Sequence, residues 1–355
     1  MHRKVRFGII GCGGIAKNNH IPGLQAIGDK AEITALCDVN LDAAKKVGEG
    51  IPGAAVYDSV EKMLAGTGLD AVCVSTPNKY HAEPTILALQ KGLHVLCEKP
   101  MATTGAEAKR MVEAAKKANK VLQIGLQLRF GGPASFMRDY VKSGEMGEIY
   151  YARAWALRRR GVPNWGVFID KGEQGGGALI DIGVHILDLT LHLMGYPKPV
   201  SASALTFSHL GTNPDLYNHY GPYDRERFTV EDMAVALVRF EDNRAISLES
   251  SFMANLEGNP YQTQLFGTGS GAIVSPFAEP NIQIFTERNQ MLFNQAPANV
   301  SKPAMNVEQM KAFLARIEGK ETPAATMKDG YTLASIIDAI YKSADTGKEE
   351  PVLGL

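Results

Sequence analysis

The first 125 residues alternate short apolar runs with longer helical segments, and this alternation constrains the fold more than any other feature of the chain. The runs are rich in β-branched residues and apolar throughout, as in strands that are covered on both faces. They are VRFGII, EITALCD, LDAVCVST, LHVLCEKP and VLQIG. The helical segments between them are LDAAKKVGEG, YHAEPTILALQKG and GAEAKRMVEAAKKANK. Because strands that alternate with helices pair in parallel, the pattern predicts an α/β fold with a doubly wound parallel sheet.

Beyond about residue 148 the pattern changes, because strand-like runs follow one another without helices between them. The clearest case is residues 231–253, two such runs joined by Glu241–Arg244 as a hairpin. Pro276 and Pro280 indicate further turns between strands. The chain closes with two amphipathic helical patterns, MNVEQMKAFLARIEG and DGYTLASIIDAIYKSA. This part of the chain is therefore expected to form a mostly antiparallel sheet with helices, an α+β arrangement.

The length of 355 residues exceeds one typical domain, so we expect two. The first, over residues 1–125, corresponds to the expected parallel α/β sheet, and the second covers residues 126–355. The formal net charge is -1, and the longest block of like charge is Arg158–Arg160. Binding to nucleic acid is therefore not expected, because it needs a concentrated basic surface.

The chain begins almost directly with a strand-like run and shows no export signal, so a cytoplasmic protein is expected. No apolar run approaches the roughly 18 residues of a membrane helix, so no membrane partner is expected. The four cysteines follow no zinc-binding spacing and are expected to be buried thiols. No metal site is predicted.

The sequence GIIGCGGIA places Gly11, Gly13 and Ala16 in a GxGxxG/A pattern between a strand and a helix. Gly11 permits the tight turn, Gly13 lets a pyrophosphate approach the backbone, and Ala16 lets the helix pack close to the strand. The other loop residues expected to contact a dinucleotide are Cys12, Gly14 and Ile15. A glycine-rich turn alone is weak evidence, and the flanking strand and helix give this one its value.

Asp38 ends the second strand-like run, where an acidic side chain reaches the adenosine ribose hydroxyls. Such a carboxylate favours NAD, because it would repel the additional phosphate of NADP, although NADP stays possible. The alternative interpretation of Asp38 is a cap of the following helix.

The segment STPNKYH follows another strand at the edge where open α/β sheets bind ligands. It is expected to line the nicotinamide half of the cofactor, or else to form an ordinary strand-to-helix turn. The residues concerned are Ser75, Thr76, Pro77, Asn78 and His81.

Glu98, Lys99 and Pro100 end the next strand-like run at the same edge. An ammonium group there can hydrogen-bond a substrate hydroxyl and stabilise the alkoxide that develops as hydride leaves carbon. The alternative is a solvated lysine paired with Glu98.

Asp181, His185, Asp188 and His192 recur at helical spacing in the otherwise apolar stretch GGGALIDIGVHILDLTLHLMG. Positions four apart share a helix face, and the surrounding leucines and isoleucines predict that the helix is largely buried. Burying ionisable groups without partners costs several kcal/mol, so the stripe must meet hydrogen-bond partners or a wet cleft. A metal site built from the last three residues has usable spacing but lacks a further ligand.

Together, GIIGCGGIA, STPNKYHAE, CEKPMA and GGGALIDIGVHILDL resemble the Gfo/Idh/MocA family, which includes glucose-fructose oxidoreductase and inositol 2-dehydrogenase. The resemblance spans nearly the whole chain. It implies a Rossmann domain, a second domain with a large open sheet, and NAD(P)-linked oxidation or reduction of sugars and polyols. It also implies a homodimer or homotetramer that forms through the second, substrate-binding domain.

Within that resemblance, Asp181 and His185 match the DxGxH motif, whose members act together with the lysine of EKP, here Lys99. His185 is then the general base, because imidazole titrates near neutral pH, and Asp181 binds a neighbouring hydroxyl. Lys99 steadies the oxygen of the carbinol whose hydride passes to nicotinamide. Asp188 and His192 have no counterpart in the motif and are expected to be structural.

Other contacts follow from the resemblance. Gln127 and Arg129 occupy positions where the family often has Asn and Arg, and Gln127, Glu98 and Lys99 are expected at the cofactor. Arg158 and Trp165 precede the DxGxH helix and are expected to bind hydroxyls or an anionic group and to stack on a sugar ring. The alternative is a surface loop with a core-packed tryptophan.

Two other functions stay open. Relatives of the family include glycosidases that oxidise their substrate transiently with bound NAD, and a non-catalytic sensor. The joint presence of Lys99, Asp181 and His185 disfavours the sensor, because binding alone needs no proton acceptor beside a lysine.

Overall fold

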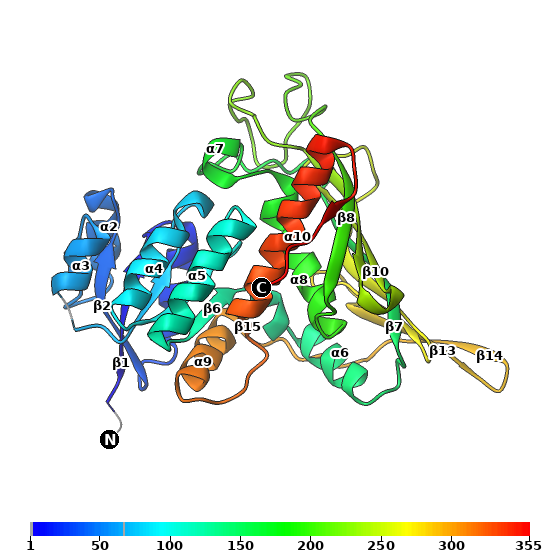
Figure 1. The fold of residues 1–355 in the computed structure, drawn as a ribbon, viewed down its shortest axis with the longest axis horizontal. Coiled ribbons are helices and arrows are strands. Elements are labelled where there is room, and N and C mark those ends of the chain that lie inside the picture. The colour runs from blue at the N-terminus through cyan, green and yellow to red at the C-terminus, as the bar shows by residue number, and fades with distance from the viewer. Residues whose placement is uncertain (1–2, 67) are drawn as a thin grey trace. The chain divides into compact units, whose positions relative to one another are not determined.

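The computed structural model describes residues 3–66 and 68–355, which divide into two compact units (Figure 1). The first unit comprises Met1–Phe130 and Ala304–Tyr331, and the second comprises Gly131–Pro303 and Thr332–Leu355. Residues 304–331 thus belong with the N-terminal part of the chain, whereas the sequence pattern places the boundary once, after residue 125.

The first unit is built on a sheet with the strand order β15-β6-β5-β4-β1-β2-β3. Its strands are β1 (Val5–Ile10), β2 (Ala31–Cys37), β3 (Ala55–Tyr57), β4 (Ala71–Val74), β5 (His94–Glu98), β6 (Leu122–Gly125) and β15 (Ala325–Thr326). All neighbours from β3 to β6 pair in parallel, and only β15 adds antiparallel. The predicted doubly wound sheet is confirmed. The short strands β3 and β15 were not predicted from the sequence.

Helices lie along this sheet, and their ends follow from local side chains. They are η1 (Ala16–His20), α1 (Ile21–Gln25), α2 (Leu41–Gly48), α3 (Val60–Gly66), η2 (Asn78–Tyr80), α4 (Ala82–Gln90), α5 (Gly105–Ala118), η3 (Gln127–Phe130) and α9 (Met305–Ile317). Thr104 caps α5 by accepting a hydrogen bond from the Glu107 amide at 3.2 Å. The helix ends at Asn119, whose left-handed backbone (φ 51°) is a usual terminator.

The core of the first unit explains why residues 304–331 belong to it. Phe7 of β1 is fully buried, and its ring centroid lies 6.0 Å from that of Phe313 on α9. A Cβ on Gly23 of α1 would lie 2.9 Å from the Asn306 carbonyl oxygen, so α1 and α9 pack closely. Burial of such large apolar side chains is worth about 1.5–3 kcal/mol each and holds α9 against the parallel sheet.

The second unit contains a sheet with the order β14-β13-β12-β11-β7-β10-β9-β8-β16. Its strands are β7 (Ile149–Leu157), β8 (Pro199–Phe207), β9 (Met233–Phe240), β10 (Ala245–Ser251), β11 (Tyr261–Gly267), β12 (Gly271–Val274), β13 (Ile282–Arg288), β14 (Met291–Gln295) and β16 (Glu350–Pro351). Only the β7–β10 pair is parallel. The predicted mostly antiparallel sheet and the predicted hairpin, β9–β10, are both confirmed.

Helices cover one face of this sheet, as Figure 1 shows for α6 and α8. The helices are α6 (Gly132–Lys142), α7 (Lys171–Gln174), η4 (Leu179–Gly183), α8 (Val184–Leu193), η5 (Glu241–Asn243) and α10 (Met327–Thr346), which starts in the first unit. The α8 helix packs on β7 and β11, and η4 packs on β10.

The helix formed by Lys171–Leu193 is long and apolar enough to cross a membrane by length and composition. The sequence analysis expected no segment to reach this length. However, 83% of its apolar window is buried inside the protein. An apolar sequence on all sides is what a helix in a protein core requires.

Candidate active site

The loop after β1 carries two glycines that the fold uses differently. Gly11 has a φ of 89°, and a Cβ there would lie 2.6 Å from the Ser75 carbonyl oxygen, so the fold itself requires glycine. A Cβ on Gly13 would meet no protein atom within 4 Å, although the residue is exposed at the cavity described below. Ala16 is completely buried against the sheet. These three positions match the demands of a dinucleotide-binding turn.

Asp38 fixes this loop to the end of β2. Its carboxylate accepts hydrogen bonds from the amides of Cys12 and Asn40, each at 2.8 Å. The cap of α2 is Asn40, whose side chain accepts from the Ala43 amide at 3.2 Å. The alternative interpretation of Asp38 as the helix cap is therefore wrong, and the carboxylate stays at the cavity edge.

A cavity of about 720 Å³ lies at the carboxyl ends of β1, β2 and β4. The predicted cofactor residues that line it are Gly11, Gly13, Asp38, Ser75, Thr76 and Pro77. The other lining residues were not predicted to contact a ligand, namely Ile10, Cys37, Val39, Asp58, Ser59, Val60, Glu61, Lys79, Tyr80, Glu83, Pro84 and Leu87. Asp58 directly follows β3, but a three-residue strand is too short to be recognised from its sequence pattern, so the sequence contained no usable signal for it.

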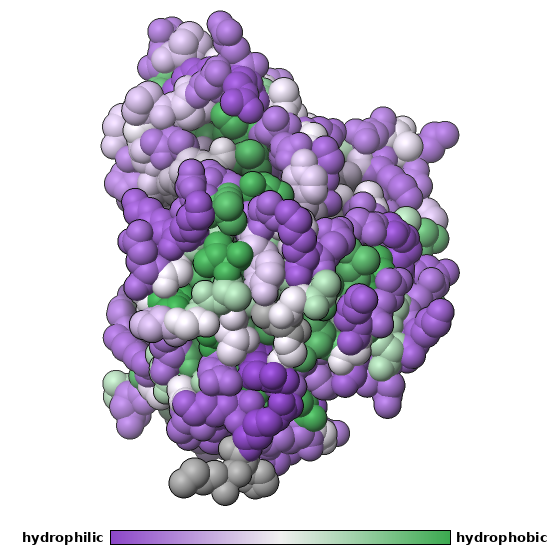
Figure 2. Space-filling view, turned by 90° about the vertical axis from the view of Figure 1, so that its left-hand side faces the viewer, coloured by the Kyte–Doolittle hydropathy of each residue, from purple (hydrophilic) through white to green (hydrophobic). Residues whose placement is uncertain are grey.

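Apolar residues contribute much of the wall of this cavity. Val39 is 93% exposed and Tyr80 is 45% exposed, and both line the cavity, where a bound ligand would cover them. Figure 2 views the side on which α2 and α3 lie, and apolar residues gather near the middle of a mostly hydrophilic face. The cavity thus combines apolar walls with convergent polar groups, as ligand sites do.

The segment after β4 is tied to its neighbours by Ser75 and His81. The Ser75 hydroxyl donates to the Gly11 carbonyl oxygen at 2.8 Å. The His81 ring nitrogens lie 2.7 Å from the Pro100 carbonyl oxygen and 2.9 Å from that of Thr76. Burial lowers the pKa of His81, against the effect of these two carbonyl groups. His81 thus links the loops after β4 and β5, and its contact with a cofactor stays a prediction.

Glu98 and Lys99 stand at the end of β5 in different surroundings. The Glu98 side chain is buried, and its Oε1 lies 2.9 Å from Nε2 of the fully buried His20, an ion contact without a directed hydrogen bond. Burial lowers the pKa of His20, but contact with Cys73 and Glu98 outweighs it and raises this pKa to about 10. Lys99 donates its backbone amide to Glu98 at 3.2 Å, and its side chain is partly exposed. The buried pair therefore anchors the backbone that carries the lysine.

Gln127 lies beside this pair, with its amide nitrogen 3.5 Å from Glu98 Oε1. Arg129 is different, because it is 2% exposed and forms an ion pair with Asp329 at 3.0 Å. Within the described residues Arg129 thus joins η3 to the returning segment of the same unit. The expected cofactor contacts of Gln127, Glu98 and Lys99 stay predictions, as do those of Cys12, Gly14, Ile15 and Asn78.

The features of the first unit fit a nicotinamide dinucleotide. Exposed Gly13 and Gly14 offer backbone that no protein side chain crowds. Asp38 lines the cavity, which lies at the ends of β1 and β4, where the order of the strands along the sheet changes direction. That point is where open α/β sheets bind nucleotides.

In the second unit, the structure divides the stripe of four ionisable residues. Asp181 and His185 are partly exposed, whereas the helical residues between and around them are buried. Asp188 is fully buried, and the Tyr196 hydroxyl donates to its Oδ1 at 2.6 Å. This contact supports the structural role expected for Asp188. His192 lines a separate cavity with Arg138 and Arg244.

The start of this helix is held by residues that the sequence analysis missed. Glu231 accepts hydrogen bonds from the Gly177 and Leu179 amides at 2.8 and 3.0 Å, which satisfies two orphan donors of the helix. The Tyr341 hydroxyl donates to the same carboxylate at 3.0 Å. Burial raises the pKa of Glu231, against the effect of the donors. This capping fixes the turn from which Asp181 projects.

The turn that contains Asp181 is a π-helical one, Leu179–Gly183. A Cβ on Gly183 would lie 2.9 Å from the Ser250 Oγ on β10, and the Ser250 hydroxyl donates to the Ala178 carbonyl oxygen at 2.7 Å. Close contact with the sheet and a widened turn therefore coincide, and π turns are frequent at functional sites. The regular α-helical stripe expected from the spacing is wrong over this first turn.

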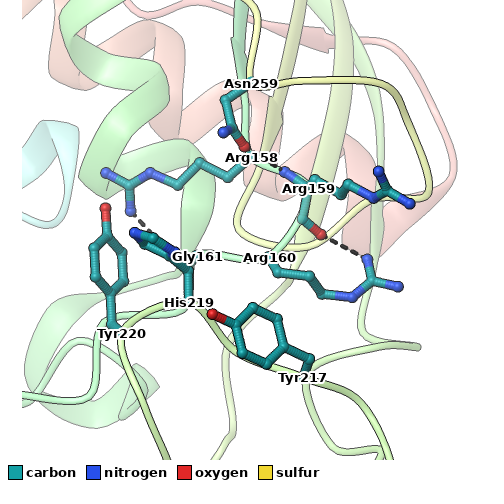
Figure 3. A pocket seen from close by; sticks show the side chains of 8 residues that line it. All are labelled: Arg158, Arg159, Arg160, Gly161, Tyr217, His219, Tyr220 and Asn259. Atoms are coloured by element: carbon teal, nitrogen blue, oxygen red, sulfur yellow. Dashed lines mark hydrogen bonds between the residues drawn. The ribbon is translucent and has the colours of Figure 1, made fainter.

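Arg158 lines a second cavity of this unit, of about 590 Å³ (Figure 3). Its other lining residues are Arg159, Arg160, Gly161, Tyr217, His219, Tyr220 and Asn259. Trp165 is 52% exposed, and its ring meets Tyr220 edge-on with 5.0 Å between centroids. The alternative of a core-packed tryptophan is therefore wrong.

Comparison with known proteins places the chain in a class. Residues 5–126 match the family described as "Oxidoreductase family, NAD-binding Rossmann fold", and residues 135–273 match "GFO/IDH/MocA C-terminal domain". The D-glucoside 3-dehydrogenase of Escherichia coli (strain K12) is 35% identical over 97% of this chain and 96% of its own length.

Solved structures of similar proteins have the same fold as this chain. Levoglucosan dehydrogenase in complex with NADH has a TM-score of 0.85 at 21% identity, over 99% of this chain and 100% of its own, which shows the shared fold. The WlbA dehydrogenase from Bordetella pertussis, in complex with NADH and UDP-GlcNAcA, has a TM-score of 0.80 at 26% identity over the same shares.

Fold and sequence together define an oxidoreductase with an NAD-binding Rossmann domain. The chain belongs to the Gfo/Idh/MocA family. The resemblance seen in the four sequence motifs is thereby confirmed, as are the fold class and the NAD cofactor.

Proposed function

We propose that this protein is an NAD-dependent dehydrogenase that transfers a hydride between nicotinamide and a secondary hydroxyl or ketone of a cyclic sugar, sugar derivative or inositol. The observation that carries the proposal is the partial exposure of Asp181 and His185 on an otherwise buried helix, in a chain whose other unit carries the NAD-binding loop and Lys99. Burying ionisable groups without partners is costly, and partial exposure lets these two side chains stay hydrated and reach a ligand.

The proposal assigns one task to each side chain. Bound NAD supplies the hydride acceptor. His185 accepts the proton of the substrate hydroxyl on a ring nitrogen, and the Lys99 ammonium stabilises the negative charge that grows on the same oxygen. Asp181 accepts a hydrogen bond from a neighbouring hydroxyl and thereby orients the ring. In the reverse direction His185 and Lys99 donate to the ketone oxygen.

Charges around the cavity of the first unit support NAD over NADP. Asp38, Asp58 and Glu61 all line it, and Lys79 is the one basic residue among its lining residues. Carboxylates near the ribose disfavour an additional phosphate through like-charge repulsion.

The names of the relatives support a sugar substrate. D-glucoside 3-dehydrogenase covers almost the full length of this chain at 35% identity, and several other matches are named as sugar or inositol dehydrogenases. Arg158 and Trp165 both contact the Tyr220 ring, so a guanidinium group that can bind hydroxyls and an aromatic face that can stack on a sugar ring lie close together.

We also propose a cytoplasmic homodimer or homotetramer that associates through the exposed face of the second unit's sheet. This face carries Leu205, 54% exposed, in a shallow cavity lined also by Val235 and Leu237. Exposed apolar surface of this kind is typical of subunit contacts.

A substrate screen tests the proposal. Purified protein with NAD is incubated with inositols, aldoses and glycosides while the absorbance of reduced nicotinamide is followed. We expect NADH from at least one cyclic polyol or sugar. Cleavage of a glycoside without net NADH would instead support the redox-assisted glycosidase, and tight NAD binding without any turnover would support a sensor.

A further inference from the structure

The cavity beside Arg158 is strongly basic and contains no acidic lining residue. Arg158, Arg159 and Arg160 all contribute to it, together with His219 and the neutral side chains of Tyr217, Tyr220 and Asn259 (Figure 3). Adjacent guanidinium groups repel one another unless a negative charge lies near them. Three successive guanidinium groups at one cavity therefore point to a ligand that brings negative charge.

The contacts of the three arginines leave their charges uncompensated. Arg158 donates to the Gly161 carbonyl oxygen at 3.0 Å and lies over the rings of Tyr220 and Phe252. Arg160 donates to the carbonyl oxygens of Arg159 and Ala254 and to the side chain of Asn255. All of these partners are neutral. Among residues 3–66 and 68–355, no carboxylate forms an ion pair with any of the three.

Arg159 differs from its two neighbours. Its backbone amide donates to Asn259 Oδ1 at 2.8 Å, which fixes the chain, whereas its exposed guanidinium has no hydrogen-bond or ion-pair partner among the described residues. Figure 3 shows the guanidinium groups of Arg159 and Arg160 on the same side of the cavity, with Arg158 on the other. A fixed cation next to an unengaged one provides the forked donors that bind carboxylate or phosphate.

Tyr261 links the segment that carries Arg158 to the turn that carries Asp181, within the same unit. Tyr261 on β11 donates its hydroxyl to the Ile182 carbonyl oxygen at 3.2 Å, next to Asp181. Burial raises the pKa of Tyr261, and Asp181 adds to this rise while Arg158 opposes it. The Leu157 amide donates to the Pro260 carbonyl oxygen at 2.9 Å, so Arg158 and Tyr261 directly follow two hydrogen-bonded residues, and Tyr261 in turn reaches the turn that carries Asp181.

The aromatic side chains give the cavity a second character. Tyr220 stands between Trp165 and His219, with ring centroids 5.0 and 5.3 Å away, and Tyr217 is 68% exposed. Flat apolar faces bind the C–H surfaces of a sugar ring, and the adjacent guanidinium groups bind its charged substituent.

We propose that the cavity is an anion subsite of the substrate-binding unit, and that the substrate is a sugar carrying a carboxylate or a phosphate, held by Arg159 and Arg160. This inference rests on the proposed sugar dehydrogenase function and narrows its substrate class. Carboxylate and phosphate share the chemistry of a compact oxyanion, and the experiment separates them.

The test is isothermal titration of the NAD-loaded protein with glucuronate, glucose 6-phosphate and methyl glucoside. We expect at least one anionic sugar to bind about tenfold more tightly than methyl glucoside. The Arg159→Gln variant should bind that anionic sugar about tenfold more weakly than the wild type, as expected for the loss of a charge-assisted hydrogen bond. The same variant should leave methyl glucoside affinity within about twofold. If glucuronate loses affinity in Arg159→Gln, the substituent that the subsite binds is a carboxylate, and if glucose 6-phosphate loses affinity, it is a phosphate. Arg288→Gln, which removes an exposed arginine of β13 outside this cavity, is the matched control.

Two results would overturn the inference. One is equal or tighter binding of methyl glucoside, and the other is unchanged anion affinity in both Arg159→Gln and Arg160→Gln. Because the readout is binding, it separates the two proposals: anion selectivity without NADH formation refutes the dehydrogenase and supports the subsite. If neutral sugars yield NADH at the same rate in the wild type and in both arginine variants, the dehydrogenase is supported and the anion subsite is refuted.

Discussion

The cavities of the two units are opposite in construction. The cavity of the first unit is formed at the ends of parallel strands, its glycines expose backbone, and Asp38, Asp58 and Glu61 make its rim acidic. The cavity of the second unit is formed by loop side chains and is basic through Arg158–Arg160. The first arrangement suits a cofactor shared by a whole family, because backbone and strand order recognise it. The second can change its ligand by changing a few side chains.

The largest expected effect concerns the helix of the second unit. His185→Ala should lower kcat by about a hundredfold to ten-thousandfold, the usual contribution of a positioned general base, while NAD affinity stays unchanged. The measurement is steady-state turnover together with NAD titration. His209→Asn, at an exposed position of the same unit, should retain wild-type turnover. A normal kcat for the alanine variant would remove His185 from the mechanism.

The second prediction separates two glycines of one loop. Gly11→Ala should destabilise the fold by more than about 1 kcal/mol, because alanine is strained at positive φ and its Cβ would meet Ser75. Gly13→Ala should leave the unfolding midpoint of the ligand-free protein unchanged but weaken NAD binding by at least about tenfold. Chemical denaturation and NAD titration of both variants give the answer. Wild-type NAD affinity in Gly13→Ala would contradict the proposed approach of the pyrophosphate.

A smaller effect is expected at Asp38. The Asp38→Asn change keeps an acceptor oxygen near the Cys12 amide but removes the charge, so the preference for NAD over NADP should fall by about twofold to fivefold. The ratio of kcat/KM values for the two cofactors measures it. If this ratio does not move, the carboxylate does not select the cofactor.

A further effect, on stability and not on catalysis, concerns the buried His20–Glu98 pair next to Lys99. His20 has a folded-state pKa of about 10, above the ordinary 6.5, so the folded protein holds this proton more tightly than the unfolded chain does. Its stabilising contribution is therefore complete below about pH 6.5 and is lost as the pH rises toward about 10. The free energy of unfolding should decline over this range, and His20→Gln should reduce the decline.

His94→Gln is the matched control for that titration. Burial lowers the pKa of His94 from 6.5 to about 4, so its contribution to stability is lost as the pH falls from about 6.5 to about 4. The control should leave the slope between about pH 6.5 and pH 10 as in the wild type. Equal slopes in wild type and His20→Gln would contradict the charged pair.

Local patterns sufficed to predict much of the first unit. The run VRFGII corresponds to β1, and the loop that follows it is recognisable because Gly11, Gly13 and Ala16 are adjacent in sequence. Strand β3 was missed because three residues carry too little periodicity, and Asp58 and Glu61 were missed with it. Residues 304–331 were assigned to the wrong part of the chain, because the packing of Phe313 on Phe7 links positions about three hundred residues apart.

The second unit was harder to predict because more of its site depends on contacts between residues far apart in the sequence. The Asp181–His185 pair was visible as polar residues in an apolar helix, but its π-helical turn depends on contact with Ser250. The carboxylate that caps this helix, Glu231, lies more than fifty residues away and carries no local signal. Tyr217 and His219 join the arginines at the cavity only because the loops fold together, and the spacing of apolar residues does not predict how loops fold.

The central claim is that Lys99 and His185 act on the same substrate oxygen. The most direct test is a double-mutant cycle in kcat with Lys99→Ala, His185→Ala and the combined variant, all at saturating NAD. Residues that act as a unit are strongly non-additive, so we predict that the combined variant is about as slow as the slower single variant. Full multiplication of the two single effects would show independent roles and would contradict the account.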